Sequence, residues 1–214
     1  MKRILSFSSF IAVLLLISVT VMFFSCKKEE PNDPDPTEPF HIQFEVNGTT
    51  IRYEDEVDNY GNGPGRRTLN EADNTCRSEY TLFSRNQSDP DYIKSSIVIE
   101  LVKKFSQTPS YNDIFNIWGT GTYEYGMWSE DSIAGSTEGV VFTYTDETGK
   151  VWSSGLLFGE QNGAEFQITE HRAVSDELFN AISKGSFSCE FHDGSGNSLT
   201  ITNGEFKART IQDL

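Results

Sequence analysis

The chain has 214 residues, with 32 acidic and 17 basic side chains, three cysteines and a formal net charge of −15. An acidic surface of this kind repels nucleic acids and anionic lipid headgroups, so we expect no nucleic-acid partner. The length suits a single domain with a substantial core.

Residues 1–25 have the pattern of an export signal. Lys2 and Arg3 supply a positive start, and residues 10–24 are apolar except for Ser18 and Thr20. A transmembrane helix needs about 20 predominantly apolar residues, which this segment approaches only by counting its hydroxyl side chains. A retained helical anchor is therefore the alternative to a cleaved signal. Cleavage would leave a chain with a formal net charge near −17, because residues 1–25 carry two basic side chains and no acid.

Cys26 is the best-defined candidate for modification. Residues 22–26, with the small Ser25 before the cysteine, resemble the lipobox of bacterial lipoproteins, although Phe23 stands where leucine is usual. The resemblance implies cleavage before Cys26 and lipidation of that residue. Acyl chains would anchor the protein durably, since each buried methylene contributes about 0.8 kcal/mol and stable anchoring takes more than one chain. The expected partner is thus a membrane, bound through lipid on Cys26.

Residues 26–39 form a predicted tether. Four prolines alternate with acidic residues, a composition that gives a stiff, extended segment unable to bury a core. Within it, the Lys-Lys-Glu-Glu sequence of residues 27–30 resembles the short charged signal that sends Bacteroidetes lipoproteins to the outer face of the outer membrane. That resemblance implies an outer-membrane protein at the cell surface. Anchoring in the periplasmic leaflet remains open.

Residues 40–214 are expected to form one β-rich domain that opens with a hairpin. Alternating apolar residues on either side of Asn47-Gly48 predict a two-residue type I′ turn, which pairs Val46 with Thr49 and Phe44 with Ile51. All of these side chains then share one face of the sheet.

Two further hairpins follow the same logic. One joins residues 140–145 to 151–157, and the other joins 187–191 to 199–201. Asn203-Gly204 is then expected to turn the chain again.

Additional strand candidates bring the total to about ten short strands: residues 79–84, 96–102, 121–128 and 164–170. This number favours an antiparallel β-sandwich, with a lipocalin-like closed barrel as the alternative. Two short helices are also expected. Residues 110–118 carry Ser110 and Asp113 at capping-box spacing, and residues 174–179 lead to Lys184-Gly185 as a stop.

Cys76 and Cys189 are the other two cysteines, and both are in phase with apolar neighbours on their strands. An oxidising compartment would permit a disulfide between them. Alternatively, both are buried free thiols that pack as small apolar residues. The sequence leaves the two interpretations open.

No catalytic or metal-binding pattern is recognisable in the sequence. His41, His171 and His192 have neither metal-ligand nor triad spacing, and each is expected to be a solvated polar residue. Nucleophile-elbow, zinc-protease and phosphate-loop motifs are missing from the sequence. We therefore expect no catalytic residue, no cofactor and no metal ion.

The best ligand candidate is an aromatic stretch. In the strand predicted at residues 121–128, Tyr123 and Tyr125 share one face while Glu124 and Trp128 take the other. An exposed Trp128 beside Glu124 would form a platform on which a sugar ring could stack. A buried Trp128 that serves only the core is the competing interpretation.

Several short motifs carry a family resemblance. The hairpin at residues 46–49 after an acidic proline tether, Gly121-Thr122-Tyr123, Gly185-x-Phe187-x-Cys189 and the segment 201–206 resemble small β-rich Bacteroidetes lipoproteins classed as domains of unknown function. The resemblance implies a β-sandwich or barrel at an outer membrane and no catalytic residues.

Three functions are compatible with these patterns. We expect a surface-displayed, non-catalytic binding module for a glycan or another nutrient. The alternatives are a structural or assembly lipoprotein that contacts envelope proteins, and a hydrolase that uses an unrecognised pair of carboxylates.

Overall fold

The computed structural model describes residues 38–55, 60–63, 67–70, 74–86, 89–127, 137–173 and 180–211. The chain divides into two units, Met1–Glu38 and Pro39–Leu214, and the second is compact. Pro39, the first residue of the second unit, is the last residue of the predicted tether.

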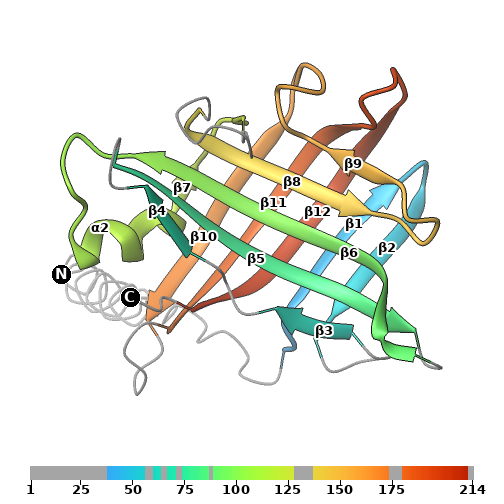
Figure 1. The fold of residues 1–214 in the computed structure, drawn as a ribbon, viewed down its shortest axis with the longest axis horizontal. Coiled ribbons are helices and arrows are strands. Elements are labelled where there is room, and N and C mark those ends of the chain that lie inside the picture. Colours follow the sequence, from blue (N-terminus) through green and yellow to red (C-terminus); the bar gives the residue numbers. More distant parts are fainter. Residues whose placement is uncertain are drawn as a thin grey trace, which may run out of the picture. The chain divides into compact units, whose positions relative to one another are not determined.

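Strands dominate this unit (Figure 1). The strands are β1 (His41–Val46), β2 (Thr49–Glu54), β3 (Tyr60–Gly63), β4 (Arg67–Asn70), β5 (Thr75–Asn86), β6 (Asp89–Lys104), β7 (Gly121–Thr122), β8 (Gly139–Thr145), β9 (Val151–Ser153), β10 (Glu165–Ala173), β11 (Asn180–His192) and β12 (Ser198–Ile211). A short helix, α2 (Tyr111–Phe115), and a 3₁₀ turn, η1 (Asn116–Trp118), lie between β6 and β7.

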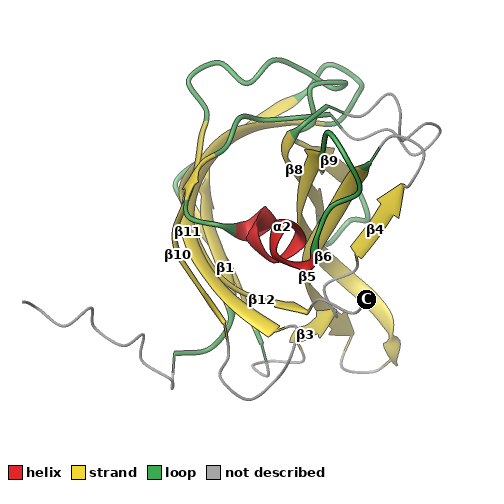
Figure 2. Ribbon diagram, turned by 90° about the vertical axis from the view of Figure 1, so that its left-hand side faces the viewer, coloured by secondary structure: helices red, strands yellow, loops and turns green. Residues whose placement is uncertain are grey.

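The described strands form a single curled antiparallel sheet. Its main path runs β2-β1-β12-β11-β9-β8-β6-β5-β3. Off this path, β10 pairs with β11, β7 pairs with β10, and β4 pairs with β5. Strand β2 also contacts β3 and β5, so the two edges of the sheet approach each other. Figure 2 shows the sheet curving around α2. The predicted all-β antiparallel class is confirmed, and the sheet has the shape of a half-barrel whose opposite walls face each other as the layers of a sandwich do.

The first hairpin is confirmed in both turn and register. Val46 pairs with Thr49 and Phe44 pairs with Ile51 across β1 and β2. Asn47 and Gly48 have φ angles of 51° and 76°, as a type I′ turn requires.

The other two predicted hairpins are also confirmed in turn and register, but the strand predicted over residues 151–157 ends at Ser153. Tyr144 pairs with Trp152 across β8 and β9, and Gly149 in the connecting turn has a φ of 81°. Cys189 pairs with Ile201 across β11 and β12.

The turn predicted at Asn203-Gly204 is wrong. Both residues lie inside the long strand β12, next to an irregularity at which the register with β1 shifts between Gln43 and Glu45. Asn203 has a φ of 51°, so the left-handed conformation that Asn favours occurs here in a bulge and not in a chain reversal.

One of the two predicted helices is confirmed. The Ser110 side chain accepts a hydrogen bond from the Asp113 backbone, and the Asp113 carboxylate accepts one from the Ser110 backbone, which completes the capping box. The other predicted helix, at residues 174–179, lies outside the described residues. Its expected stop, Lys184-Gly185, is wrong, because these residues belong to β11.

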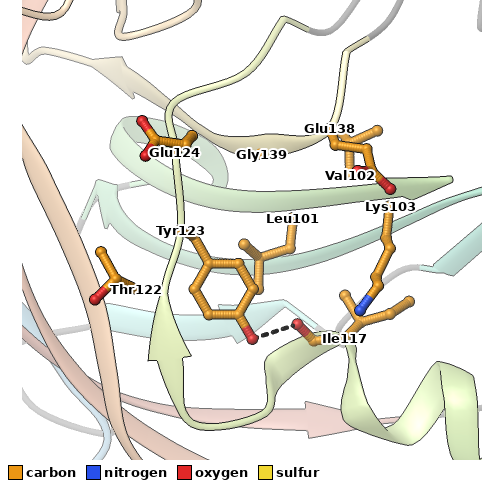
Figure 3. Close-up of a pocket in the computed structure, with 9 residues that line it drawn as sticks. All are labelled: Leu101, Val102, Lys103, Ile117, Thr122, Tyr123, Glu124, Glu138 and Gly139. Carbon is orange, nitrogen blue, oxygen red and sulfur yellow. Dashed lines mark hydrogen bonds between the residues drawn. The ribbon is translucent and has the colours of Figure 1, made fainter.

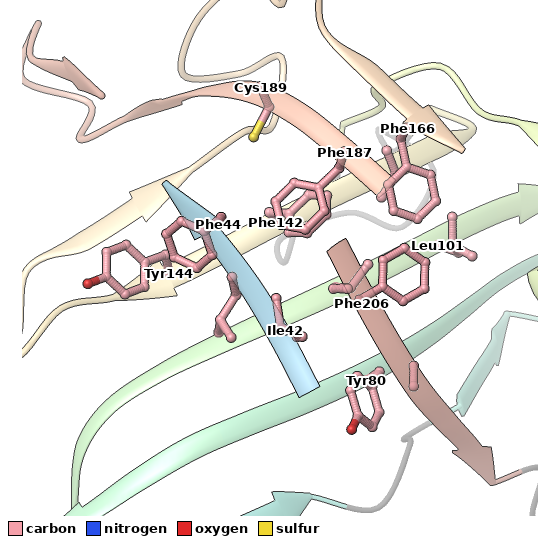
Figure 4. Close-up of a cluster of buried hydrophobic side chains, with 14 of the residues drawn as sticks. Ile42, Phe44, Tyr80, Leu101, Phe142, Tyr144, Phe166, Phe187, Cys189 and Phe206 are labelled. Atoms are coloured by element: carbon pink, nitrogen blue, oxygen red, sulfur yellow. The ribbon is translucent and has the colours of Figure 1, made fainter. Parts of the chain in front are cut away.

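The core lies between the facing walls of the curled sheet (Figure 4). Phe142 on β8 stacks on Phe187 of β11 with 4.4 Å between ring centroids, and Phe166 on β10 stacks on Phe206 of β12 at 5.4 Å. These ring pairs connect strands that are distant in the sequence, and each pair adds about 0.5–1.5 kcal/mol to simple burial.

Candidate functional site

The segment from residue 121 to 127 bridges the gap between β10 and β8. At one end β7 pairs with β10, and the Tyr123 N–H donates to the Phe166 carbonyl at 2.9 Å. Further along, the Val140 N–H donates to the Glu124 carbonyl at 2.9 Å. Of residues 121–127, the described part of the predicted strand 121–128, only Gly121–Thr122 is a strand, while Tyr125 makes an isolated bridge to β8. The segment crosses between two strands instead of extending one of them.

Glycine makes this crossing possible. A Cβ atom on Gly139 would collide with the Glu124 carbonyl oxygen, and one on Gly126 would lie 2.8 Å from the Glu138 carbonyl oxygen. Gly139 also has a φ of 136°, which disfavours any other residue. The crossing segment and the start of β8 can therefore approach closely at Gly126 and Gly139, because neither residue has a side chain.

The helical turn η1 supports the same segment from the other side. Trp118 is fully buried, and its indole N–H donates to the Ser78 hydroxyl on β5 at 2.8 Å. The Tyr123 hydroxyl lies 2.5 Å from the Gly119 carbonyl oxygen and 3.1 Å from that of Ile117. Burial raises the pKa of Tyr123, so this hydroxyl stays protonated and fixes the ring in place.

A pocket of about 240 Å³ opens between this segment and the ends of β6 and β8 (Figure 3). The side chains of Leu101 and Ile117 are buried in its floor, and the half-buried ring of Tyr123 forms one wall. In Figure 3 the Lys103 side chain extends toward Ile117. The lining residues are Leu101, Val102, Lys103, Ile117, Thr122, Tyr123, Glu124, Glu138 and Gly139.

The charged groups of the pocket are on its rim. Lys103, Glu124 and Glu138 are all exposed. Glu138 is held by the Lys104 backbone N–H, which donates to its carboxylate at 2.7 Å. An apolar floor, an aromatic wall and a rim of charged hydrogen-bonding groups can hold a small polar molecule that has one apolar face.

The predicted platform is only partly described. Glu124 is exposed and lines the pocket, as a ligand-binding role requires. Trp128 lies outside the described residues, as does the lipidation candidate Cys26. Lys103 and Glu138 were not predicted as site residues, because they meet Glu124 only through the close approach of β6, β8 and the crossing segment.

The possible disulfide between Cys76 and Cys189 is not formed. Both cysteines are buried thiols that form no disulfide. They lie on β5 and β11, which are not neighbours in the sheet. Burial raises the pKa of the Cys189 thiol, which makes it a poor nucleophile. The structure therefore agrees with the second interpretation, in which Cys76 and Cys189 are thiols that pack as core residues.

The expectation that all three histidines are solvated is wrong. His41 is only 5% exposed, with Nδ1 3.1 Å from the Pro39 carbonyl oxygen. His192 is half-buried against the chain at Gly159. Alternation along a strand does not reveal such burial, because the covering groups come from other parts of the chain.

His171 is half-buried, and its ring contacts the hydroxyl group of Ser183. Serine and histidine also contact each other in the active sites of many hydrolases. The His171 Nδ1 atom lies 2.9 Å from the Ser183 hydroxyl, and the ring packs 4.6 Å from that of Phe115. Ser183 is completely buried, so no substrate can reach it. Burial lowers the pKa of His171, which favours the neutral ring. The pair holds β10 against β11 and is structural.

Among the described residues, no three histidine, cysteine or acidic side chains are grouped so as to hold a metal ion. None of the helices in the described part of the chain is long and apolar enough to span a membrane. No family model, curated protein or solved structure matches this chain.

Proposed function

We propose that the chain is an outer-membrane lipoprotein, held at the cell surface by acyl chains on Cys26, and that its β-rich domain is a non-catalytic binding module. The observation that carries this proposal is the order of segments before the domain: a basic start, an apolar run, Ser25-Cys26, and an acidic, proline-rich tether. The tether leads to Pro39, where the compact unit begins. This order suits a domain held clear of a bilayer.

The pocket beside Tyr123 supports a binding role. Its charged groups stand at the rim, where they can hydrogen-bond a ligand, and its buried floor is apolar. The contact between His171 and Ser183 is closed to a substrate in this structure, because Ser183 is 0% exposed. A sugar ring fits this chemistry, since one of its faces is apolar and its hydroxyl groups can bond to Glu124 and Glu138.

A glycan array with the lipid-free mature chain, beginning at residue 27, tests the binding role. We expect binding to a defined saccharide, and at least about tenfold weaker binding for Glu124→Gln, which loses a charge-assisted hydrogen bond. Glu165→Gln is the matched control, because Glu165 is an exposed acid on β10 and does not line the pocket. Equal affinity of both variants for the saccharide, or no binding at all, would remove the saccharide role.

Cell fractionation and protease treatment of intact cells test the location. The native protein should fractionate with the outer membrane and be digested from outside, whereas Cys26→Ala should lose membrane association. A membrane-bound protein that resists digestion until the outer membrane is opened would place the domain in the periplasm instead.

A further inference from the structure

Three of the large apolar side chains that are exposed in the described residues are consecutive in the sequence: Leu156 is 45% exposed, Leu157 59% and Phe158 50%. Val151 and Ile93 are comparably exposed but lie elsewhere in the sequence, on β9 and β6. Single exposed apolar residues are common, but a contiguous group usually marks an interaction site. Leu156–Phe158, here called the apolar turn, lies in the β9–β10 connection.

The apolar turn is firmly attached to the sheet through its backbone. The Gly155 N–H donates to the Ser153 hydroxyl at 3.0 Å, and the Leu156 N–H donates to the Gly126 carbonyl at 3.1 Å. A further bond of 2.9 Å from the Phe158 N–H to the Gly155 carbonyl closes the turn.

The residues that follow the turn are equally fixed. Gly159 lies so close to the His192 ring that a Cβ atom there would collide with it. Gln161 bonds to the Glu190 backbone twice, accepting from its N–H at 2.9 Å and donating to its carbonyl at 2.6 Å. The backbone is therefore held by hydrogen bonds on both sides of the three exposed apolar side chains.

The shape of the apolar turn favours a lipid environment. All three consecutive side chains are about half-exposed, so a medium that surrounds the turn covers more of their surface than a contact on one side does. The interior of a bilayer is apolar on every side and covers a protruding group completely.

The tether can bring the apolar turn to a membrane. The twelve residues 27–38, which belong to the predicted tether, would span roughly 37 Å if extended at about 3.1 Å per residue. His41 follows the tether and pairs with Lys207 of β12. The apolar turn lies near the opposite end of β12, by the β11–β12 loop, where Phe158 contacts Gly194. The intervening length of β12, from Ser198 to Lys207, is about 30 Å. Since the domain is held near the bilayer, even weak insertion would be well populated.

The charges near the turn favour neutral lipid. Asp193, next to Gly194, is paired with Lys150 at 2.7 Å, while Glu160 is exposed just after the turn. Neither these groups nor the strongly acidic chain offers a basic patch for anionic headgroups.

We propose that Leu156–Phe158 is a membrane-insertion turn, which places these three side chains among the acyl chains of the bilayer to which the chain is anchored. The proposal rests on the anchoring at Cys26 for the nearness of that bilayer. Insertion would orient the domain and set the direction in which its pocket faces.

Flotation of the lipid-free chain, beginning at residue 27, with phosphatidylcholine vesicles tests the proposal. This chain contains the whole compact unit Pro39–Leu214. We expect it to float with the vesicles, and the combined variant Leu156→Ser, Leu157→Ser and Phe158→Ser to partition at least about tenfold less. Ile93→Ser is the control, since it removes a similarly exposed apolar side chain on β6 and should float like the parent chain.

A fluorescent label shows whether the turn itself enters the lipid. The chain beginning at residue 27 has only the buried Cys76 and Cys189, so Leu157→Cys provides one accessible thiol. An environment-sensitive dye at that position should shift to shorter wavelength with vesicles and be quenched by spin-labelled acyl chains. Failure to float, an unshifted dye, or a triple variant that floats like the parent would overturn the proposal.

Two other outcomes are distinguishable. Self-association without vesicles that is lost in the triple variant would make the turn a protein interface and overturn membrane insertion. The absence of lipid on Cys26 in the native protein would overturn the proposed anchoring, while the vesicle result, obtained without that lipid, would still decide whether the turn inserts.

Discussion

Phe206 on β12 lies directly opposite Gly185 on β11, and its ring occupies the space that a side chain at position 185 would need. A Cβ atom on Gly185 would be 2.7 Å from Cε1 and Cζ of that ring, and it would also collide with the Gln167 carbonyl oxygen of β10. The neighbouring pair is reciprocal, since Phe187 of β11 lies opposite Gly204 of β12. The glycines of two sequence motifs thus make room for each other's phenylalanines.

Gly185→Ala should destabilise the domain. The added methyl group would push β11 away from β10 or displace the Phe206 ring from its stack on Phe166, and overpacking of this kind typically costs about 1–3 kcal/mol. The free energy of unfolding in urea measures the effect. Ser186→Ala, at the next and exposed position of β11, is the control and should change stability by less than about 0.5 kcal/mol. An unchanged stability for Gly185→Ala would show that the strands are not packed as described.

Cys76 and Cys189 should remain unreactive in the folded protein. Both are buried, and the pKa of Cys189 is raised by that burial, so little thiolate is available at neutral pH. We expect a maleimide reagent to add to neither thiol in the native lipid-free chain and to both after unfolding without reductant. If neither thiol is modified after unfolding and the mass of the chain is two hydrogens lower, the two cysteines form a disulfide, which would contradict the structure.

Asp193 should make stability depend on acidity. The ion pair with Lys150, with hydrogen bonds from the Asn197 side chain and from the backbone of Ser195 and Asn197, holds the pKa of this carboxyl well below its usual range. A carboxyl whose pKa is lower in the folded state stabilises the fold above its unfolded pKa of about 3.9 and loses that contribution as the pH falls further.

The variant Asp193→Asn isolates this effect. Urea unfolding should show it less stable than the parent at pH 7, with the difference shrinking as the pH falls below about 4. A difference that stays constant across this range would mean that Asp193 is not charged and paired in the folded state.

Local signals in the sequence explain which parts of the fold could be predicted. The β1–β2 hairpin depends on Asn47-Gly48, whose backbone preferences act within four residues. Asn203-Gly204 has the same local preference but forms a bulge, because the strands on both sides of β12 continue to pair past it. A dipeptide therefore predicts a backbone conformation, while the surrounding sheet decides whether the chain reverses.

The candidate site was less accessible to such reasoning. Glu124 could be selected because it is polar in an aromatic stretch, but its neighbours Lys103 and Glu138 come from other strands. The crossing that joins them depends on Gly139, where contact with the Glu124 carbonyl leaves no space for a side chain. Glycine is common in turns, and its role in a long-range backbone contact has no signature within the sequence.

Mass spectrometry of the mature N-terminal peptide, isolated from the native membrane fraction, tests the central proposal most directly. The proposal predicts a peptide that begins at Cys26 and carries the added mass of acyl chains, and predicts that Cys26→Ala abolishes that species. A peptide that begins elsewhere, or one with an unmodified Cys26, would contradict a lipid-anchored binding module.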